Sequence, residues 1–175
     1  MEHTRPATIE QFLRELGTSI HGPCRLNIGG STGLILAGML SRRTDDVDAV
    51  NEVPVAIRSN HELVEQLAAR YGLRLAHFQS HYLPDHWETR LKSFGVFGHL
   101  QIFLVDPLDI ALGKLFSRRE KDLDDLRVLA PVVGKTNLQQ RLQSSGEGLL
   151  SEPQFRENAQ RNWYILFGDS LPANL

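Results

Sequence analysis

The segment Leu26-Asn27-Ile28-Gly29-Gly30-Ser31 is the most informative part of this chain for predicting its fold. Its first three residues alternate as in a short strand, and the apolar run at 32–40 that follows predicts a buried helix. The two glycines therefore lie at a strand-to-helix turn, where backbone N–H groups and the positive end of the helix dipole attract an anion. We expect Gly29, Gly30 and Ser31 to form a phosphate cradle, in which Ser31 caps the helix or donates its hydroxyl.

A pair of carboxylates, Asp46 and Asp48, follows this predicted helix in Asp46-Val47-Asp48-Ala49-Val50. If these residues form a strand, both carboxylates project from one face, while Val47 and Ala49 face the other way. Two close carboxylates repel each other, and a hard cation such as Mg²⁺ or Mn²⁺ relieves that repulsion. Each motif alone also fits a plain turn or a solvated acidic loop, but their order and spacing together favour nucleotide chemistry.

This order of motifs resembles the nucleotidyltransferase superfamily related to DNA polymerase beta, in which a hydrophobic strand, Gly-Gly or Gly-Ser, a helix and Asp-x-Asp follow one another. The chain is also similar to minimal bacterial nucleotidyltransferases of toxin–antitoxin and abortive-infection systems (AbiEii-like). Those proteins add Arg-x-Thr before the Asp pair, matched here by Arg42-Arg43-Thr44, and a later Lys…Arg-x-Lys-Asp-x-x-Asp, matched at 114–125. The resemblance spans roughly residues 26 to 130.

A helix is predicted to start at Asp106-Pro107-Leu108-Asp109, with Asp106 as cap and proline at the first position. Charged residues recur beyond it at the spacing of one continuous helix, namely Lys114, Arg118, Lys121, Asp122 and Asp125. By itself this pattern is typical of a solvated, salt-bridged helix face. With the upstream motifs, the three basic residues become candidates for triphosphate contacts, and the two carboxylates are expected to hold those cations in place.

The resemblance implies a third carboxylate on a later strand beside the Asp pair. The matching strand here, at 99–105, carries none, and Gln101 occupies the expected position. An amide brings no charge and is a poor general base, so this departure bears on catalysis more than on metal binding. Asp106, at the end of that strand, is the candidate substitute.

Bulk composition indicates a small globular chain of 175 residues with a net charge of −2. A near-neutral balance does not predict a surface coated by nucleic acid, although basic residues cluster locally at Arg42-Arg43. The single cysteine, Cys24, cannot form an internal disulfide, which suits a reducing cytoplasm. The N-terminus has no signal pattern and no apolar run approaches about 20 residues, so we expect neither export nor a membrane span.

The predicted fold class is α/β (α+β): a small mixed sheet flanked by helices, of nucleotidyltransferase type, with a helical C-terminal extension. We expect a nucleotidyltransferase-like domain at 1–135 and an extension at 136–175 packed on the same core. Besides the strands already described, the sequence predicts strands at 53–57 and 74–78 and a strand pair or active-site loop within 79–98. Helices are expected at 8–17, 59–71, 136–142 and 153–167.

The expected function is Mg²⁺- or Mn²⁺-dependent transfer of a nucleoside monophosphate from a nucleoside triphosphate. Asp46 and Asp48 serve as catalytic and metal residues, and the triphosphate is bound by Gly29, Gly30, Ser31, Lys114, Arg118 and Lys121. The acceptor is an RNA end, such as that of a tRNA, or a protein hydroxyl, and a cognate toxin or antitoxin is a possible partner. The alternative is a noncatalytic module of the same fold that binds nucleotide or a partner protein; a third possibility is a phosphotransferase.

Overall fold

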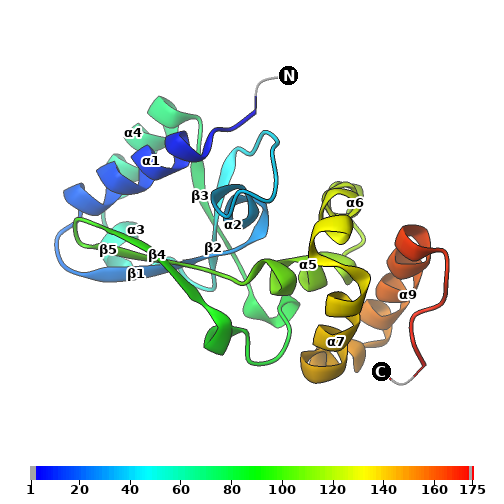
Figure 1. Ribbon diagram of the computed structural model, residues 1–175. Helices are drawn as coiled ribbons and strands as arrows, with labels where there is room; N and C mark the ends of the chain where they lie inside the picture. Colours follow the sequence, from blue (N-terminus) through cyan, green and yellow to red (C-terminus); the bar gives the residue numbers. More distant parts are fainter. Residues whose placement is uncertain (1–2, 174) are drawn as a thin grey trace. The chain divides into compact units, whose positions relative to one another are not determined.

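Five strands form one mixed sheet in the order β3-β2-β1-β5-β4 (Figure 1). The computed structural model describes residues 3–173 and 175. The strands are β1 (Cys24–Ile28), β2 (Asp46–Val50), β3 (Arg74–Phe78), β4 (Lys92–Phe97) and β5 (Leu100–Leu104). The central strand β1 runs antiparallel to β2 and parallel to β5, while β3 is parallel to β2 and β4 is antiparallel to β5.

The described residues form two compact units. The first unit holds the sheet and comprises the described residues up to Ser80 together with 91–105, and the second comprises 81–90 and the residues from Asp106 onward. Helices of the first unit are α1 (Pro6–Ser19), α2 (Gly30–Leu36), α3 (Val55–Arg58) and α4 (His61–Tyr71). The second unit holds α5 (Pro107–Leu115), α6 (Glu120–Val133), α7 (Lys135–Ser145), α8 (Glu147–Leu150) and α9 (Pro153–Phe167). Of two short 3-10 turns before β4, Trp87–Arg90 belongs to the second unit, and Ser80–Tyr82 lies where the chain passes from the first unit to the second.

Helices α1 and α4 pack against each other and cover one face of the sheet, α1 over β4 and β5 and α4 over β3 (Figure 1). The strands alternate accordingly, because Val47 and Ala49 of β2 and Ile102 of β5 are fully buried beneath these helices. The residues between them point to the opposite face of the sheet. This alternation leaves the polar positions of β2 on the face that α1 and α4 do not cover.

The structure confirms the predicted fold class, a mixed sheet flanked by helices with further helices at the C-terminus. The strand predicted at 53–57 is wrong, because Pro54 cannot donate to a sheet ladder and instead precedes the short helix α3. Helix α1 begins at Pro6 and runs past Gly17, the residue expected to end it. A side chain at Gly17 would collide with the backbone carbonyl of Phe97, so this glycine serves close packing of α1 on β4.

One continuous helix through the charged residues after Pro107 was also a wrong expectation, because α5 ends at Leu115 and α6 starts at Glu120. The carbonyl oxygens at the end of α5 accept hydrogen bonds from side chains rather than from N–H groups of a further helical turn. Asn162 donates to Leu115 O (2.9 Å) and Ser117 O (2.8 Å), and Asn158 donates to Phe116 O (3.0 Å). Both asparagines are buried on α9, so a helix far along the chain ends α5 by satisfying its last carbonyls.

Within the described ranges, no helix combines the length and the apolar character needed to cross a membrane.

Candidate functional site

Asp46 and Asp48 lie two positions apart on β2, both half-buried and on the face opposite Val47 and Ala49, as predicted. Asp46 is level with Arg74 of the neighbouring strand β3, and its carboxylate lies 3.5 Å from that guanidinium. Because the Arg74 side chain is largely exposed, this ion pair holds Asp46 only weakly. The two carboxylates therefore sit side by side on the face of the sheet that α1 and α4 do not cover, next to α2.

The glycine turn meets this carboxylate pair. The N–H of Gly29 donates to Asp48 O (2.9 Å), which fixes the turn against β2. Gly30 adopts a φ of +56°, and a Cβ added there would lie 2.5 Å from Asp48 Oδ2. Only glycine satisfies both conditions, because a side chain would be strained in the left-handed region and would push the carboxylate away. The two motifs are thus one site.

Thr32, a residue that the sequence reasoning placed only in an apolar helix, ties α2 to the carboxylate strand. Its hydroxyl donates to Asp46 O (2.6 Å), lies 3.3 Å from Asp48 Oδ2 and accepts from Asp48 N–H (3.4 Å). Thr32 is completely buried, so these bonds are shielded from water. The signal in the sequence was a hydroxyl residue directly after Gly-Gly-Ser.

Arg42 is a second residue absent from the predicted site. Its guanidinium donates to Ser31 Oγ within the expected cradle and to Arg43 O (3.1 Å). The sequence offered Arg42 only as part of the Arg-x-Thr resemblance. Helix α2 has seven residues and ends at Leu36, four positions before the predicted end. With so short a helix, an anion at this turn would be bound by the Arg42 and Ser31 side chains more than by a helix dipole.

A divalent cation fits this donor set. Asp46 and Asp48 offer hard carboxylate oxygens on one face, and Mg²⁺ is commonly held by one or two carboxylates while water and substrate phosphates complete its shell. The described part of the chain contains no cluster of three or more His, Cys, Asp or Glu side chains that could hold a metal. The residues present therefore fit a cation that arrives with a phosphate ligand rather than a closed metal cage.

Gln101 does not stand beside the Asp pair, because β1 separates β5 from β2. Gln101 is level with Arg25 of β1, whereas Asp48 is level with Gly29. At strand spacing, this register puts Gln101 about 13 Å along the sheet and about 10 Å across it from Asp48. Val105, which follows β5, lies closer to the glycine turn, since its Cγ2 is 3.4 Å from the position of a Cβ at Gly29. This residue is a buried valine and offers no acid.

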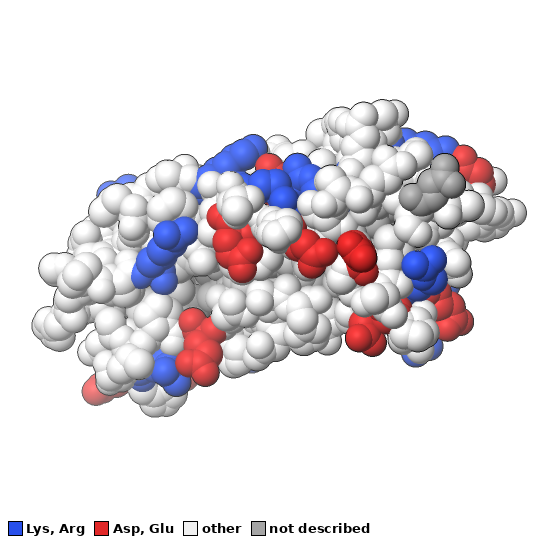
Figure 2. Space-filling view, turned by 90° about the horizontal axis from the view of Figure 1, so that it is seen from below, with Lys and Arg blue, Asp and Glu red and all other residues white. Residues whose placement is uncertain are grey.

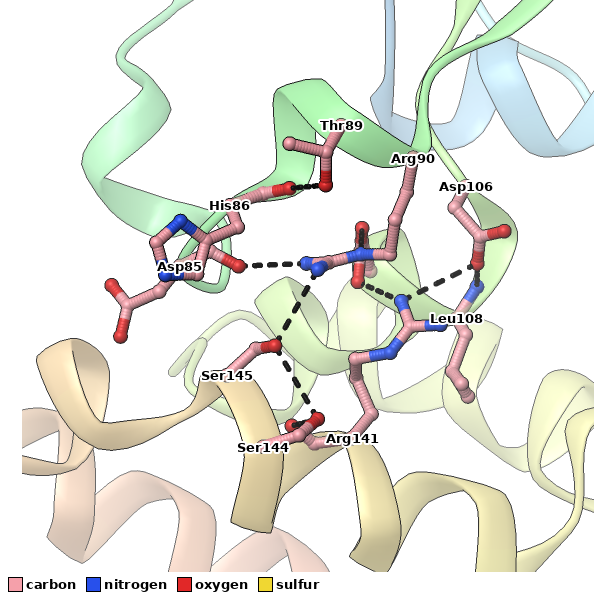
Figure 3. A network of polar contacts seen from close by, with 10 residues as sticks. Asp85, His86, Thr89, Arg90, Asp106, Leu108, Arg141, Ser144 and Ser145 are labelled. Atoms are coloured by element: carbon pink, nitrogen blue, oxygen red, sulfur yellow. Dashed lines mark hydrogen bonds and ion pairs between the residues drawn. The ribbon is translucent and has the colours of Figure 1, made fainter.

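Asp106, the expected substitute, has a structural role in the second unit (Figure 3). Its carboxylate accepts from Leu108 N–H (2.9 Å), which confirms the predicted cap of α5, and it lies 3.7 Å from Arg141 NH1. Arg141 also pairs with the wholly buried Asp109, which binds Arg90 Nε as well (2.7 Å). This network joins residues 81–90 to α5 and α7 inside the second unit (Figure 3).

The predicted basic residues of the second unit differ sharply in exposure. Lys114 is only 8 % exposed, and its Nζ lies 2.7 Å from Asp122 Oδ1 and 2.9 Å from Asp125 Oδ2. The expectation that these carboxylates hold a basic side chain in place is confirmed for Lys114. Burial alone would raise the pKa of Asp122, but Lys114 and a hydrogen bond from Ser117 outweigh burial and hold that pKa below its usual value.

Arg118 and Lys121, the other two predicted contacts, are exposed. Arg118 lies in the connection between α5 and α6, and Lys121 lies in the first turn of α6. Figure 2 shows acidic and basic side chains intermixed over the face in view rather than gathered by sign. This mixture agrees with the near-neutral net charge of −2.

Comparison with known proteins assigns the chain to a family. The family described as "Nucleotidyltransferase of unknown function (DUF6036)" matches residues 7–163. A search of curated proteins and a search of solved structures each found no match. The family match includes the glycine turn, the carboxylate pair and the helices α5 to α8. Because it covers most of the sequence, the chain belongs to this family of nucleotidyltransferases of unknown function.

Proposed function

We propose that this protein is a Mg²⁺- or Mn²⁺-dependent nucleotidyltransferase that moves a nucleoside monophosphate from a nucleoside triphosphate such as ATP to an acceptor hydroxyl. The observation behind the proposal is that Gly30, in the glycine turn, lies so close to the Asp48 carboxylate that a Cβ there would be 2.5 Å from Asp48 Oδ2. Because the turn lies directly against the carboxylate pair, a phosphate bound by the turn and a cation bound by the pair would be neighbours. The family assignment supports the same class of reaction.

The roles of the residues follow from their chemistry. Asp46 and Asp48 supply the metal-ligand oxygens, and a cation bound there would supply positive charge against the triphosphate. Ser31 donates its hydroxyl to a phosphate oxygen, and Arg42 contributes a charged donor beside it. The acceptor hydroxyl attacks the α-phosphorus and releases its proton to water, while the bond to the β-phosphate oxygen breaks and pyrophosphate leaves. Arg42 stabilises the negative charge that develops on this leaving group.

Arg118 and Lys121 remain proposed triphosphate contacts, since both are exposed cations. We assign Lys114 to the ion pairs of the second unit instead, because its ammonium is buried between two carboxylates. For the acceptor we propose an RNA end or a protein hydroxyl, in a toxin–antitoxin setting that includes a cognate partner protein. We further place the reaction in the cytoplasm, the compartment in which nucleoside triphosphates are made and used.

A noncatalytic module that binds nucleotide is the second candidate, and one observation favours it. The strand on which the resemblance implies a third carboxylate carries none, and the residue beside the glycine turn at its end is the buried Val105. Without that acid, a general base for the acceptor hydroxyl has to come from solvent or from the Asp pair itself. Binding of triphosphate without transfer would identify this candidate.

The deciding experiment incubates the protein with each nucleoside triphosphate, Mg²⁺ and total RNA, and measures added mass on RNA and on protein. Transfer by the wild type that disappears in Asp48→Asn supports the proposal. The matched control is Asp45→Asn, since Asp45 is the neighbouring exposed carboxylate outside the site. Transfer that persists in Asp48→Asn contradicts the residue assignment, and triphosphate binding without transfer favours the noncatalytic module.

A further inference from the structure

Thr4, which precedes α1, is bonded to the loop that carries Arg42. The N–H of Thr4 donates to Arg42 O (3.2 Å), its Oγ1 donates to Thr44 O (3.0 Å), and Thr44 N–H donates back to Thr4 Oγ1 (2.9 Å). These bonds join segments 40 residues apart in the chain. Thr4 is half-buried and lies outside the residues 7–163 that match the family.

Both ends of the clamped loop reach the candidate site. At one end, the Arg42 guanidinium donates to Ser31 Oγ. At the other end, Thr44 Oγ1 donates to Asp46 O (3.1 Å), the same carbonyl that accepts from Thr32. Thr44 is buried, so its side chain and backbone are held on both sides. The hydroxyl of Thr4 thus fixes the loop from outside while the site residues fix it from inside.

This arrangement has a chemical consequence for Ser31. A hydroxyl oxygen that accepts a hydrogen bond from a guanidinium directs its own hydrogen elsewhere, toward an acceptor such as a phosphate oxygen. Arg42 therefore presents Ser31 as a donor and adds its own positive charge at the same place. A long arginine side chain loses much rotamer freedom when it is held in one position. If the loop is already fixed in the free protein, triphosphate binding costs less conformational entropy.

We propose that Thr4 is a positioning residue for triphosphate binding, which holds the 42–44 loop so that Arg42 and Ser31 together bind phosphate oxygens. The proposal rests on the proposed function, because it assigns a role in the same nucleotide site. It predicts that the N-terminal segment before α1 controls nucleotide affinity without touching the nucleotide.

The test measures the Kd of ATP with Mg²⁺ by calorimetry for variants of the full chain. Thr4→Val keeps the side-chain volume but removes the two bonds made by the hydroxyl. We expect Kd to rise about three- to tenfold, the loss typical of one or two hydrogen bonds. Thr4→Ser retains the hydroxyl and should bind as the wild type does. Thr18→Val is the matched control, because the Thr18 hydroxyl bonds only to carbonyls of its own helix.

A double-mutant cycle separates positioning from a purely structural role. If Thr4 acts through Arg42, Thr4→Val should raise Kd in the wild type but add nothing further in the Arg42→Met background. A structural residue would lower the melting temperature in both backgrounds and leave Kd unchanged. Equal losses of affinity in both backgrounds would also overturn the proposal, because they would show that Thr4 does not act through Arg42.

The result for the wild type separates failure of the proposed function from failure of the positioning role of Thr4. Wild-type protein that binds none of the nucleoside triphosphates with Mg²⁺ refutes the proposed function and the role of Thr4 with it; if another triphosphate binds better than ATP, its Kd is measured instead. Wild-type binding that Thr4→Val leaves unaltered refutes the positioning role alone. Wild-type binding weakened by Thr4→Val, restored by Thr4→Ser and unaffected by Thr18→Val supports the proposal.

Discussion

Replacing Gly30 with alanine tests whether the glycine turn and Asp48 form one site. The added Cβ faces two penalties, since the φ of +56° is strained for any side chain and Asp48 Oδ2 would lie 2.5 Å away. The backbone strain costs about 1–2 kcal/mol. A carboxylate displaced to relieve the second contact can no longer share a cation with Asp46. We therefore expect a modest loss of stability and a loss of Mg²⁺–triphosphate affinity of more than about tenfold, or 1.4 kcal/mol.

Gly72→Ala is the matched control for the backbone strain that a side chain causes at a positive φ. Gly72 ends α4 with a φ of +64°, and nothing lies within 4 Å of a Cβ placed there. Both variants should lower the melting temperature by about 2–8 °C, given about 2–4 °C per kcal/mol for a chain of this size. Only Gly30→Ala should weaken nucleotide binding in a calorimetric titration. Wild-type affinity in Gly30→Ala, or an equal loss in Gly72→Ala, would show that the glycine turn and Asp48 do not form one nucleotide site.

Three further predictions concern the residues that the structure reassigns. Lys114→Met should destabilise the protein by about 3–5 kcal/mol, because it removes the buried ammonium from between two buried carboxylates, whereas Lys121→Met on the exposed face should change the denaturation midpoint little. Since the pKa of Asp122 is lowered on folding, its stabilising effect is present above its ordinary pKa and is lost as pH falls through its folded value. Denaturation followed from neutral pH downward should therefore lose stability in acid less steeply for Asp122→Asn than for the wild type. Gln101→Glu should leave Mn²⁺ affinity unchanged in a titration, because β1 stands between β5 and the Asp pair; tighter binding would contradict the strand order.

Local sequence patterns predicted those parts of the fold that depend on neighbouring residues. Strict alternation placed β2 at Asp46–Val50, with both carboxylates on one face. The cap at Asp106 and the stop at Gly168 of α9 also follow from chain-local chemistry, the second because glycine adopts the left-handed φ of +72°. The glycine turn and the Asp pair belong to this class, so the centre of the candidate site was predictable.

Interactions between distant segments were not predictable from local patterns. The end of α5 depends on Asn158 and Asn162, which lie more than 40 residues further along the chain. The place of Gln101 depends on strand order, which a strand's own residues do not encode. The contact between Arg42 and Ser31 depends on the path of the connecting loop. In each case the sequence supplied the residue type, and the tertiary fold selected its partner.

Melting curves with ATP and Mg²⁺ for the wild type and for the Asp46→Asn/Asp48→Asn double variant test whether the Asp pair binds the nucleotide. Binding to the native state at 100 times Kd stabilises a protein by about 2.7 kcal/mol, so the wild-type melting temperature should rise by about 5–10 °C. Asp45→Asn, which alters a neighbouring carboxylate that is 59 % exposed, should keep this increase. We predict that the double variant folds but that ATP with Mg²⁺ does not raise its melting temperature. A full increase in the double variant would contradict the assignment of the nucleotide site to Asp46 and Asp48.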